Sequence, residues 1–81
     1  MNVFYTPVFK ERLKECPKEI RLKFYKQISQ LKQNLRHPSL RAKKYEKRKD
    51  VWQARVDRNY RFYFLIEKDT YILVDIRSHP N

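Results

Sequence analysis

The side chains of this sequence best suited to chemistry lie in three segments that alternate between apolar and polar residues, 51–57, 60–67 and 71–77. The odd positions of these segments carry most of their polar groups: Arg55, Asp57, Arg61, Tyr63, Asp75 and Arg77. Side chains of a β-strand point alternately to its two faces, so we expect this set to share one face of a sheet. Three arginines on one strand face need paired carboxylates or an anionic ligand.

RNA cleavage is a reaction that such a face could perform without a metal, because RNA supplies its own nucleophile in the 2′-hydroxyl. The protein must then supply a base, an acid and cations beside the developing phosphorane charge. Arg55 and Arg61 are the predicted phosphate clamp, since a guanidinium presents paired donors to phosphate oxygens. His79 continues the odd positions past Arg77, and histidine is a residue type suited to act as a general acid or base. Tyr63 could stack on a base or take part in proton transfer.

A purely structural interpretation of the same residues is also open. Arg55 and Arg77 could pair with the carboxylates on their own face instead of binding a ligand. Tyr63 could be a packing residue, and His79, close to the end of the sequence, could be a solvated side chain. Cys16, the single cysteine, is predicted to be a small core residue.

The net charge is the strongest compositional signal. Twenty Lys and Arg against nine Asp and Glu give +11, a charge that attracts polyanions. The cations are spread along the whole chain and are not concentrated on one amphipathic helix, which favours nucleic acid over a membrane surface. Residues 37–50 hold six of them, just before the predicted sheet. The candidates from this segment for phosphate binding are Lys43, Lys44, Lys47 and Arg48.

Length and cysteine content limit the class of protein. Eighty-one residues predict a single domain over 1–81, and one cysteine excludes an internal disulfide or a thiolate zinc site. We expect no cofactor. No apolar stretch is long enough to span a bilayer, and the N-terminus lacks a secretory pattern, so we expect a cytoplasmic protein.

The helices that must position this face are predicted in the first half of the chain. A short strand at 3–5 precedes a helix that begins with Thr6 as N-cap and Pro7 at the first helical position. A second helix carries one apolar stripe: Ile20, Phe24, Ile28, Leu31 and Leu35. The pair His37-Pro38 ends it, with His37 as a capping or loop residue, and residues 37–50 are predicted to be a loop.

The three C-terminal segments predict an antiparallel sheet whose even positions, from Trp52 to Ile76, face the helices. Even positions pair with even ones if both hairpins have three-residue loops, 58–60 and 68–70. A two-residue turn at 68–69 would place Asp75 opposite a core residue and is rejected. Without glycine, we expect Asn59 and Asp69 to supply any positive φ. This register predicts one row of Asp57, Arg61 and Arg77 and another of Arg55, Tyr63 and Asp75.

The predicted fold class is therefore α+β, in the order β-α-α-β-β-β, with a two-helix hairpin on one face of an antiparallel sheet. This order resembles the RelE/ParE toxin superfamily, whose fold is like that of microbial RNases. Four local phrases carry the resemblance over nearly the full chain: His-Pro-Ser-Leu-Arg at 37–41, Val-Trp-Gln-Ala-Arg-Val at 51–56, Asn-Tyr-Arg at 59–61 and Asp-Ile-Arg-Ser-His at 75–79.

The resemblance implies roles for several residues. Arg61 corresponds to the strand arginine that contacts the scissile phosphate in ribosome-dependent members. His79 falls where members carry Arg or His at the end of the last strand, and Arg55 falls at a basic position of the preceding strand. Gln53 occupies a position where some members have lysine, and with Tyr63, Arg77 and the 37–50 cations it is expected to bind RNA.

The resemblance also implies a biological role. Such proteins are toxins of type II toxin–antitoxin systems; the RelE-like branch consists of metal-independent endoribonucleases that cut mRNA in the ribosomal A site. The implied partners are the ribosome, mRNA and a cognate antitoxin, and an acidic, partly disordered partner suits so basic a chain. Two alternatives stay open: a ParE-like inhibitor of DNA gyrase, or a non-catalytic basic module that binds RNA or an antitoxin.

Overall fold

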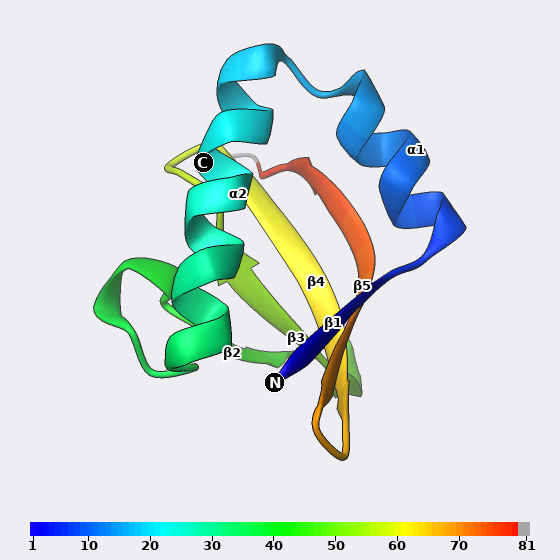
Figure 1. Ribbon diagram of the computed structural model, residues 1–81, viewed down its shortest axis with the longest axis vertical. Helices are drawn as coiled ribbons and strands as arrows, with labels where there is room; N and C mark the ends of the chain where they lie inside the picture. Colours follow the sequence, from blue (N-terminus) through cyan, green and yellow to red (C-terminus); the bar gives the residue numbers. More distant parts are fainter. Residues whose placement is uncertain (80–81) are drawn as a thin grey trace.

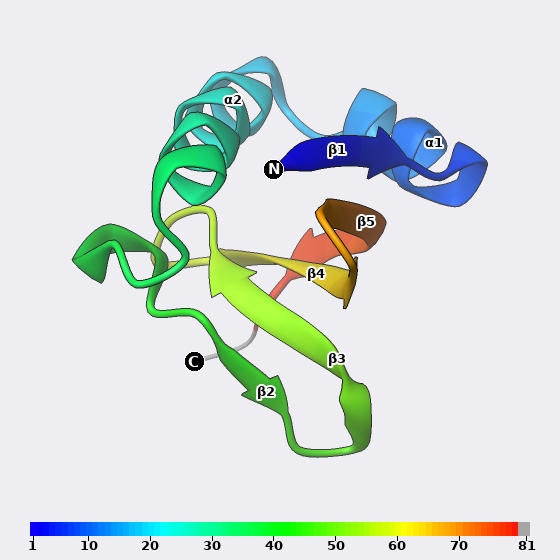
Figure 2. The ribbon, with the colours of Figure 1, turned by 60° about the horizontal axis from the view of Figure 1, so that its bottom comes forward.

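The computed structural model describes residues 1–79, which form one mixed five-stranded sheet with two helices on one face (Figures 1 and 2). The elements in chain order are β1 (Asn2–Tyr5), α1 (Pro7–Glu15), α2 (Lys18–Gln33), the 3₁₀ turn η1 (Pro38–Leu40), β2 (Lys43–Tyr45), β3 (Arg48–Arg55), β4 (Tyr60–Glu67) and β5 (Thr70–Ser78). The strand order is β1-β5-β4-β3-β2. The α+β class and the order of the predicted elements are confirmed.

Two features of the sheet differ from the prediction. The sheet is mixed and not antiparallel throughout, because β1 pairs with β5 in parallel, from Asn2 opposite Thr70 to Tyr5 opposite Leu73. Residues 37–50 are also not a simple loop, since they contain η1, all of β2 and the start of β3. The short strand β2 adds an edge beside β3, with Lys43 opposite Gln53.

Both helices begin where their sequence signals place them, but α2 ends at Gln33, before Leu35 and before the His37-Pro38 pair that was expected to end it. Thr6 caps α1: its Oγ1 accepts a hydrogen bond from the Phe9 N–H at 3.2 Å and donates one to the Leu73 carbonyl at 2.7 Å. The Arg21 guanidinium in α2 donates to the Cys16 carbonyl at 2.6 Å, which joins the two helices at their connection. From there α1 and α2 diverge, as Figure 1 shows. No helix in residues 1–79 is long and apolar enough to cross a membrane.

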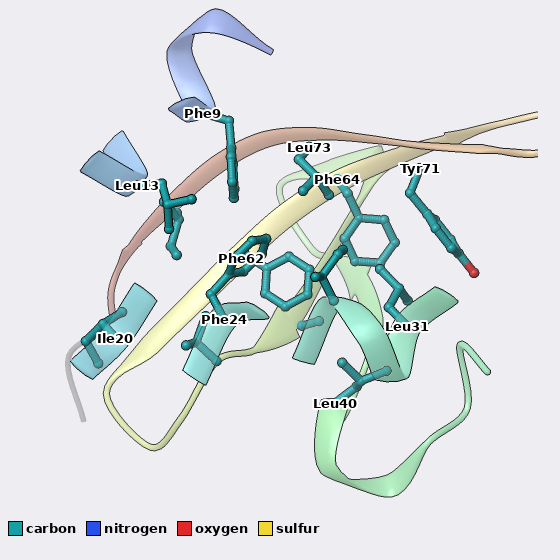
Figure 3. Close-up of a cluster of buried hydrophobic side chains, with 14 of the residues drawn as sticks. Phe9, Leu13, Ile20, Phe24, Leu31, Leu40, Phe62, Phe64, Tyr71 and Leu73 are labelled. Carbon is teal, nitrogen blue, oxygen red and sulfur yellow. The ribbon is translucent and has the colours of Figure 1, made fainter. Parts of the chain in front are cut away.

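The core lies between the helices and the inner face of the sheet (Figure 3). The largest fully buried side chains are Phe9, Phe24, Leu31, Leu40, Phe62, Phe64 and Leu73. Phe24 of α2 meets Phe62 of β4 edge to face, with ring centroids 5.3 Å apart, a geometry favoured by aromatic quadrupoles. Cys16 is buried at its edge, 8% exposed, as predicted.

The start of β5 does not follow the predicted alternation. Tyr71 and Leu73, at odd positions, face the core, 4% and 0% exposed, whereas Ile72 is only half-buried. The pairing of β4 with β5 shifts between Tyr63 opposite Asp75 and Phe64 opposite Leu73, which leaves Val74 as an extra residue. This bulge changes the parity of the strand, so the expectation that every even position faces the helices is wrong for residues 71–73.

Both predicted hairpin loops are also wrong. The bulge allows the rejected turn: Glu67 pairs with Thr70, and Lys68-Asp69 alone connect β4 to β5. In the other hairpin β3 ends at Arg55, which pairs with Arg61, and β4 begins at Tyr60, so residues 56–59 connect the two strands. The register expected at the far end of the β4–β5 pair is correct, with Arg61 opposite Arg77 and Tyr63 opposite Asp75.

Positive backbone angles fall on residues other than those expected. Within residues 1–79 they occur at Arg41, with φ 46°, and at Lys68, with φ 53°, and not at Asn59 or Asp69. The β3–β4 turn needs none because Asp57 folds it: Oδ1 accepts from the Asn59 and Tyr60 N–H groups at 2.8 and 3.0 Å. Such an aspartate side chain replaces a backbone acceptor in the turn.

Candidate functional site

Three arginines form one row across the face of the sheet that lies away from the helices. Arg55 of β3 is opposite Arg61 of β4, and Arg61 is opposite Arg77 of β5. The expected row held Asp57 in place of Arg55; the longer β3–β4 turn removes this carboxylate and substitutes a cation. A pocket of about 270 Å³ opens beside the row, and we call it the arginine pocket. It is lined by Arg41, Lys43, Gln53, Arg55, Arg61 and His79.

The next row on the same face is largely polar. Lys43 of β2 is opposite Gln53, Gln53 is opposite Tyr63, and Tyr63 is opposite Asp75. The structure therefore brings Gln53 and Lys43 beside the arginines, although the sequence placed Lys43 in a loop. Gln53 therefore has Lys43 beside it across the sheet and Arg55 two residues further along β3.

Arg55 is a cation without a compensating anion. Its Nε atom is buried and has no hydrogen-bond partner within the described chain. Burial lowers the pKa of its guanidinium, and the charges of Arg41, Arg61 and Arg58 lower it further. Among residues 1–79 no carboxylate forms an ion pair with Arg55 or Arg61. An anionic ligand would relieve this repulsion.

Arg61 is held in place by the turn that precedes it. Its Nη1 donates to the carbonyls of Asp57 at 2.9 Å and Tyr60 at 3.1 Å. These bonds fix one edge of the guanidinium and leave its other nitrogens for a ligand. Such prior anchoring reduces the entropy lost on binding a phosphate.

Arg77 is arranged as the top of a stack. Its guanidinium carbon lies 4.7 Å from the centroid of the Tyr63 ring, and its Nη2 donates to the Tyr45 hydroxyl at 3.3 Å. Tyr63 is only 5% exposed, so it cannot stack on a base while Arg77 covers it. The planar group exposed at this point is therefore the Arg77 guanidinium, and a guanidinium can itself stack on an aromatic ring such as a base.

Asp57 and Asp75 do not make the ion pairs with Arg55 and Arg77 that the purely structural interpretation proposed, apart from one long contact. Asp75 pairs with Arg12 of α1 at 3.2 Å and only loosely with Arg77, at 3.9 Å. Asp57 pairs with Lys23 of α2 at 3.3 Å. Burial would raise the pKa of the Asp57 carboxyl, but hydrogen bonds from Asn59, Lys23 and Tyr60 lower it overall. Neither carboxylate pairs with Arg55 or Arg61.

His79 stands where the arginine pocket meets a smaller one of about 210 Å³, because it lines both. It is half-buried, and its backbone N–H donates to the Asn59 carbonyl at 2.6 Å. This bond extends the β4–β5 pairing past Ser78 and holds the imidazole beside Lys43 and Gln53. A proton donor or acceptor is thus close to the cations that would hold a phosphate.

The cations of residues 43–48 are dispersed. Lys47 lines the smaller pocket together with His79. Lys44 is opposite Trp52, with Nζ 5.3 Å from the Trp52 ring, so it lies on the other face of the sheet. Arg48 is exposed and pairs with Asp50 at 3.4 Å. The structure does not bring Lys44 or Arg48 to the arginine row.

Two residues of the site were not singled out from the sequence. Arg41 lines the arginine pocket from a left-handed backbone conformation directly after η1. Glu46 lines the smaller pocket and is the one carboxylate, within residues 1–79, that lines either of the two. The sequence signals were their place in the 37–50 segment and, for Arg41, the His-Pro-Ser-Leu-Arg phrase at 37–41, and neither signal tells which side chains turn toward the sheet.

Three guanidinium groups, a lysine and an imidazole around one groove can bind a phosphodiester and transfer a proton. The fold that presents them is shared with known toxins. The YoeB/ParE toxin from Agrobacterium tumefaciens superposes with a TM-score of 0.80 at 12% identity, covering 99% of this chain and 100% of that one. YafQ from E. coli gives 0.80 at 15% identity, covering 95% and 91%.

A chain of the RelB–RelE antitoxin–toxin complex from Methanococcus jannaschii has a TM-score of 0.74 at 23% identity and covers 93% of this chain and 88% of that one. At such identities the likeness shows a toxin fold of the RelE type. The sequence adds the family: residues 3–80 match the model of the ParE toxin of the type II toxin–antitoxin system parDE. The chain belongs to this family of the RelE/ParE superfamily, and is a type II toxin. No curated protein matches it.

Proposed function

We propose that this toxin is a metal-independent endoribonuclease that cuts mRNA on the ribosome and so inhibits translation in the cytoplasm. The arginine row with His79 beside it is the observation that carries the proposal. Arg55 and Arg61 form no ion pair within residues 1–79, and Arg77 has only a long one, so the row favours a ligand with closely spaced negative charge, and a phosphodiester has that property.

Each residue of the site has a proposed role. Arg61 and Arg55 bind the scissile phosphate and stabilise the added charge of the phosphorane. His79 transfers a proton, as the base for the 2′-hydroxyl or the acid for the 5′ oxygen. Arg77, on its tyrosine stack, supports a neighbouring nucleotide by stacking or charge, while Gln53 and Lys43 contact the RNA from the second row.

The test is primer extension on a reporter mRNA in a translating extract, with the wild-type protein and with Arg61→Ala. We expect cuts within codons that require translation and that decrease at least about 100-fold in the variant, the usual effect of removing a donor to a developing oxyanion. Arg36→Ala, which removes an exposed charge that belongs neither to the row nor to the lining of the arginine pocket, should cut normally. An uncut message with normal translation would exclude the nuclease proposal.

A second candidate follows from the family match, which names ParE and not RelE. In this reading the toxin inhibits DNA gyrase and cuts no RNA. Induction in cells separates the two: gyrase-linked DNA breaks with intact mRNA would decide for the second candidate, and cut mRNA with intact DNA would decide for the first.

The proposed regulator is a cognate antitoxin. Solved neighbours of this fold include antitoxin–toxin complexes with RelB and with YefM. A net charge of +11 favours an acidic partner whose carboxylates complement the cations of this chain.

A further inference from the structure

A second cationic pocket lies on the helix side of Arg55, between α2, η1 and the β3–β4 turn, which come together at one side of the molecule (Figure 2). Its volume is about 570 Å³, and we call it the α2 pocket. Five cations line it: Lys23, Lys26, Arg41, Arg55 and Arg58. The roles proposed above use only Arg55 from this set.

The α2 pocket has a large uncompensated positive charge. Lys23 is neutralised, because its Nζ lies 3.2 Å from Glu19 and 3.3 Å from Asp57. The other four cations, Lys26, Arg41, Arg55 and Arg58, form no ion pair within residues 1–79. A concave surface with four unpaired cations is complementary to a polyanion.

The wall of this pocket is fixed by a buried polar side chain. Gln27 of α2 is 6% exposed, and its Nε2 donates to the carbonyls of Arg55 at 2.8 Å and Ser39 at 3.1 Å. Its Oε1 accepts from the Ser39 hydroxyl at 3.2 Å. One side chain therefore joins α2, η1 and the end of β3, and holds the backbones next to two of the arginines.

Arg41 is held there at a cost. It adopts φ 46°, a left-handed conformation that is unfavourable for a residue other than glycine. Its N–H donates to the Pro38 carbonyl at 3.3 Å, which closes η1. Residues kept in such conformations are more frequent at binding sites than elsewhere.

Arg41 and Arg55 line both the α2 pocket and the arginine pocket, so the two pockets share a wall. A strand whose scissile phosphate lies on Arg61 can therefore continue over Arg55 into the second pocket. We propose that the α2 pocket binds the phosphate backbone of the RNA beside the nucleotide that is cut, with Lys26, Arg41 and Arg58 as ligands. This inference rests on the proposed function.

A protein segment fits another surface of the molecule better. The groove between α1 and α2 is lined by Tyr5, Leu13 and Tyr25 together with three cations, Lys10, Lys14 and Arg21. An amphipathic helix with acidic residues at its edges could cover it. The α2 pocket is bounded mainly by charged and polar side chains and continues the arginine pocket, as a site for an extended anionic strand should.

The test compares two double variants that lose the same charge, K26Q/R58Q in the α2 pocket and K10Q/K14Q on α1. All four side chains are exposed, so both proteins should fold. Binding of 2′-O-methyl RNA, which cannot be cleaved, is followed by fluorescence anisotropy over a range of salt concentrations. Two RNAs are compared. One has about 12 nucleotides and can reach both pockets, and the other is a trinucleotide, which is too short to fill both.

For the longer RNA we expect K26Q/R58Q to bind roughly tenfold more weakly. The slope of log affinity against log salt should become less steep by about 1.4, from the loss of two phosphate contacts. The trinucleotide should bind K26Q/R58Q as it binds the wild type, and K10Q/K14Q should keep the wild-type slope with both RNAs.

An equal change in both variants would show a general charge effect and overturn the proposal. The proposal would also be overturned if the wild type binds and cuts RNA and K26Q/R58Q binds the longer RNA with the same affinity and salt slope. That outcome leaves the proposed function intact. Polyglutamate serves as a probe for an acidic protein partner. If K26Q/R58Q binds RNA normally but has lost affinity for polyglutamate, the pocket is assigned to an acidic protein and the proposal is overturned. A wild type that neither binds nor cuts RNA would reject the proposed function itself.

Discussion

At the residue scale, the arginine row is an arrangement that is unfavourable until a ligand binds. Arg61 is supported by turn carbonyls, which leave its charge unneutralised, and Arg77 by two tyrosines and a long contact of 3.9 Å with Asp75. Arg55 has the least support, because its Nε is buried without a partner and three other arginines repel it. Sites that keep such groups commonly trade stability for function.

Replacing Arg55 by methionine should therefore make the folded protein more stable and less active. The Arg55→Met variant keeps an unbranched apolar side chain and removes both the repulsion and the unpaired buried Nε. We expect a higher midpoint of urea unfolding and a loss of mRNA cleavage. Arg48→Met, which removes an exposed arginine paired with Asp50, is the control and should not gain stability. A lower midpoint for Arg55→Met would show that Arg55 supports the fold.

At the element scale, the β3–β4 turn decides which residues enter the row. Asp57 accepts two backbone hydrogen bonds within the turn, and its second oxygen pairs with Lys23 of α2. The turn thereby sets Arg55 opposite Arg61, and it also supplies the carbonyls that hold the Arg61 guanidinium. Inserting or deleting one residue in this loop would shift the register of β3 by one position and turn Arg55 to the core face.

Asp57→Ala should destabilise the protein by about 1–2 kcal/mol near neutral pH, because two turn N–H groups lose their acceptor. Asp57→Asn keeps an acceptor oxygen and should lose less stability.

The folded state lowers the pKa of Asp57, so its ionised form contributes stability above about pH 4, and this contribution is lost as pH falls through the lowered pKa. Urea unfolding at several pH values should show a shallower acid dependence for Asp57→Asn than for the wild type; equal dependence would remove Asp57 from the account.

At the scale of the whole molecule, charge is the dominant property. A net charge of +11 on a body with a radius of gyration of 11.5 Å opposes folding through self-repulsion. The ion pairs of the described chain are mostly at the surface, where each contributes little, so they do not offset this term. The same charge promotes binding to RNA and to an acidic partner.

Added salt should therefore move stability and RNA affinity in opposite directions. Between about 0.05 and 0.5 M NaCl, screening should raise the melting temperature because it weakens self-repulsion. Over the same range RNA affinity should fall steeply, since each phosphate contact on a single strand contributes about −0.7 to the log–log slope. Calorimetry and anisotropy on one preparation measure both, and a melting temperature that falls with salt would contradict the account.

The sequence by itself determined the parts of the fold that depend on local chemistry. Thr6 and Pro7 set the start of α1, the apolar stripe set the buried face of α2, and the alternation within β3 and β4 set their inner and outer faces. It also placed Arg61 opposite Arg77, because these residues lie beyond the bulge and keep even positions paired with even ones. These features follow from periodicity and capping, which neighbouring residues decide.

Only the tertiary structure decided the rest of the site. The parallel pairing of β1 with β5 and the burial of Tyr71 and Leu73 oblige β5 to change parity, and the bulge at Val74 absorbs the change. Docking of η1 through Gln27 turns Arg41 toward two pockets, and pairing of β2 with β3 brings Lys43 to Gln53. These choices depend on contacts between residues far apart in the chain. The free energy of these long-range contacts is not reflected in a local sequence pattern. The pattern could therefore predict a face that carries arginines, but not which arginines lie opposite one another.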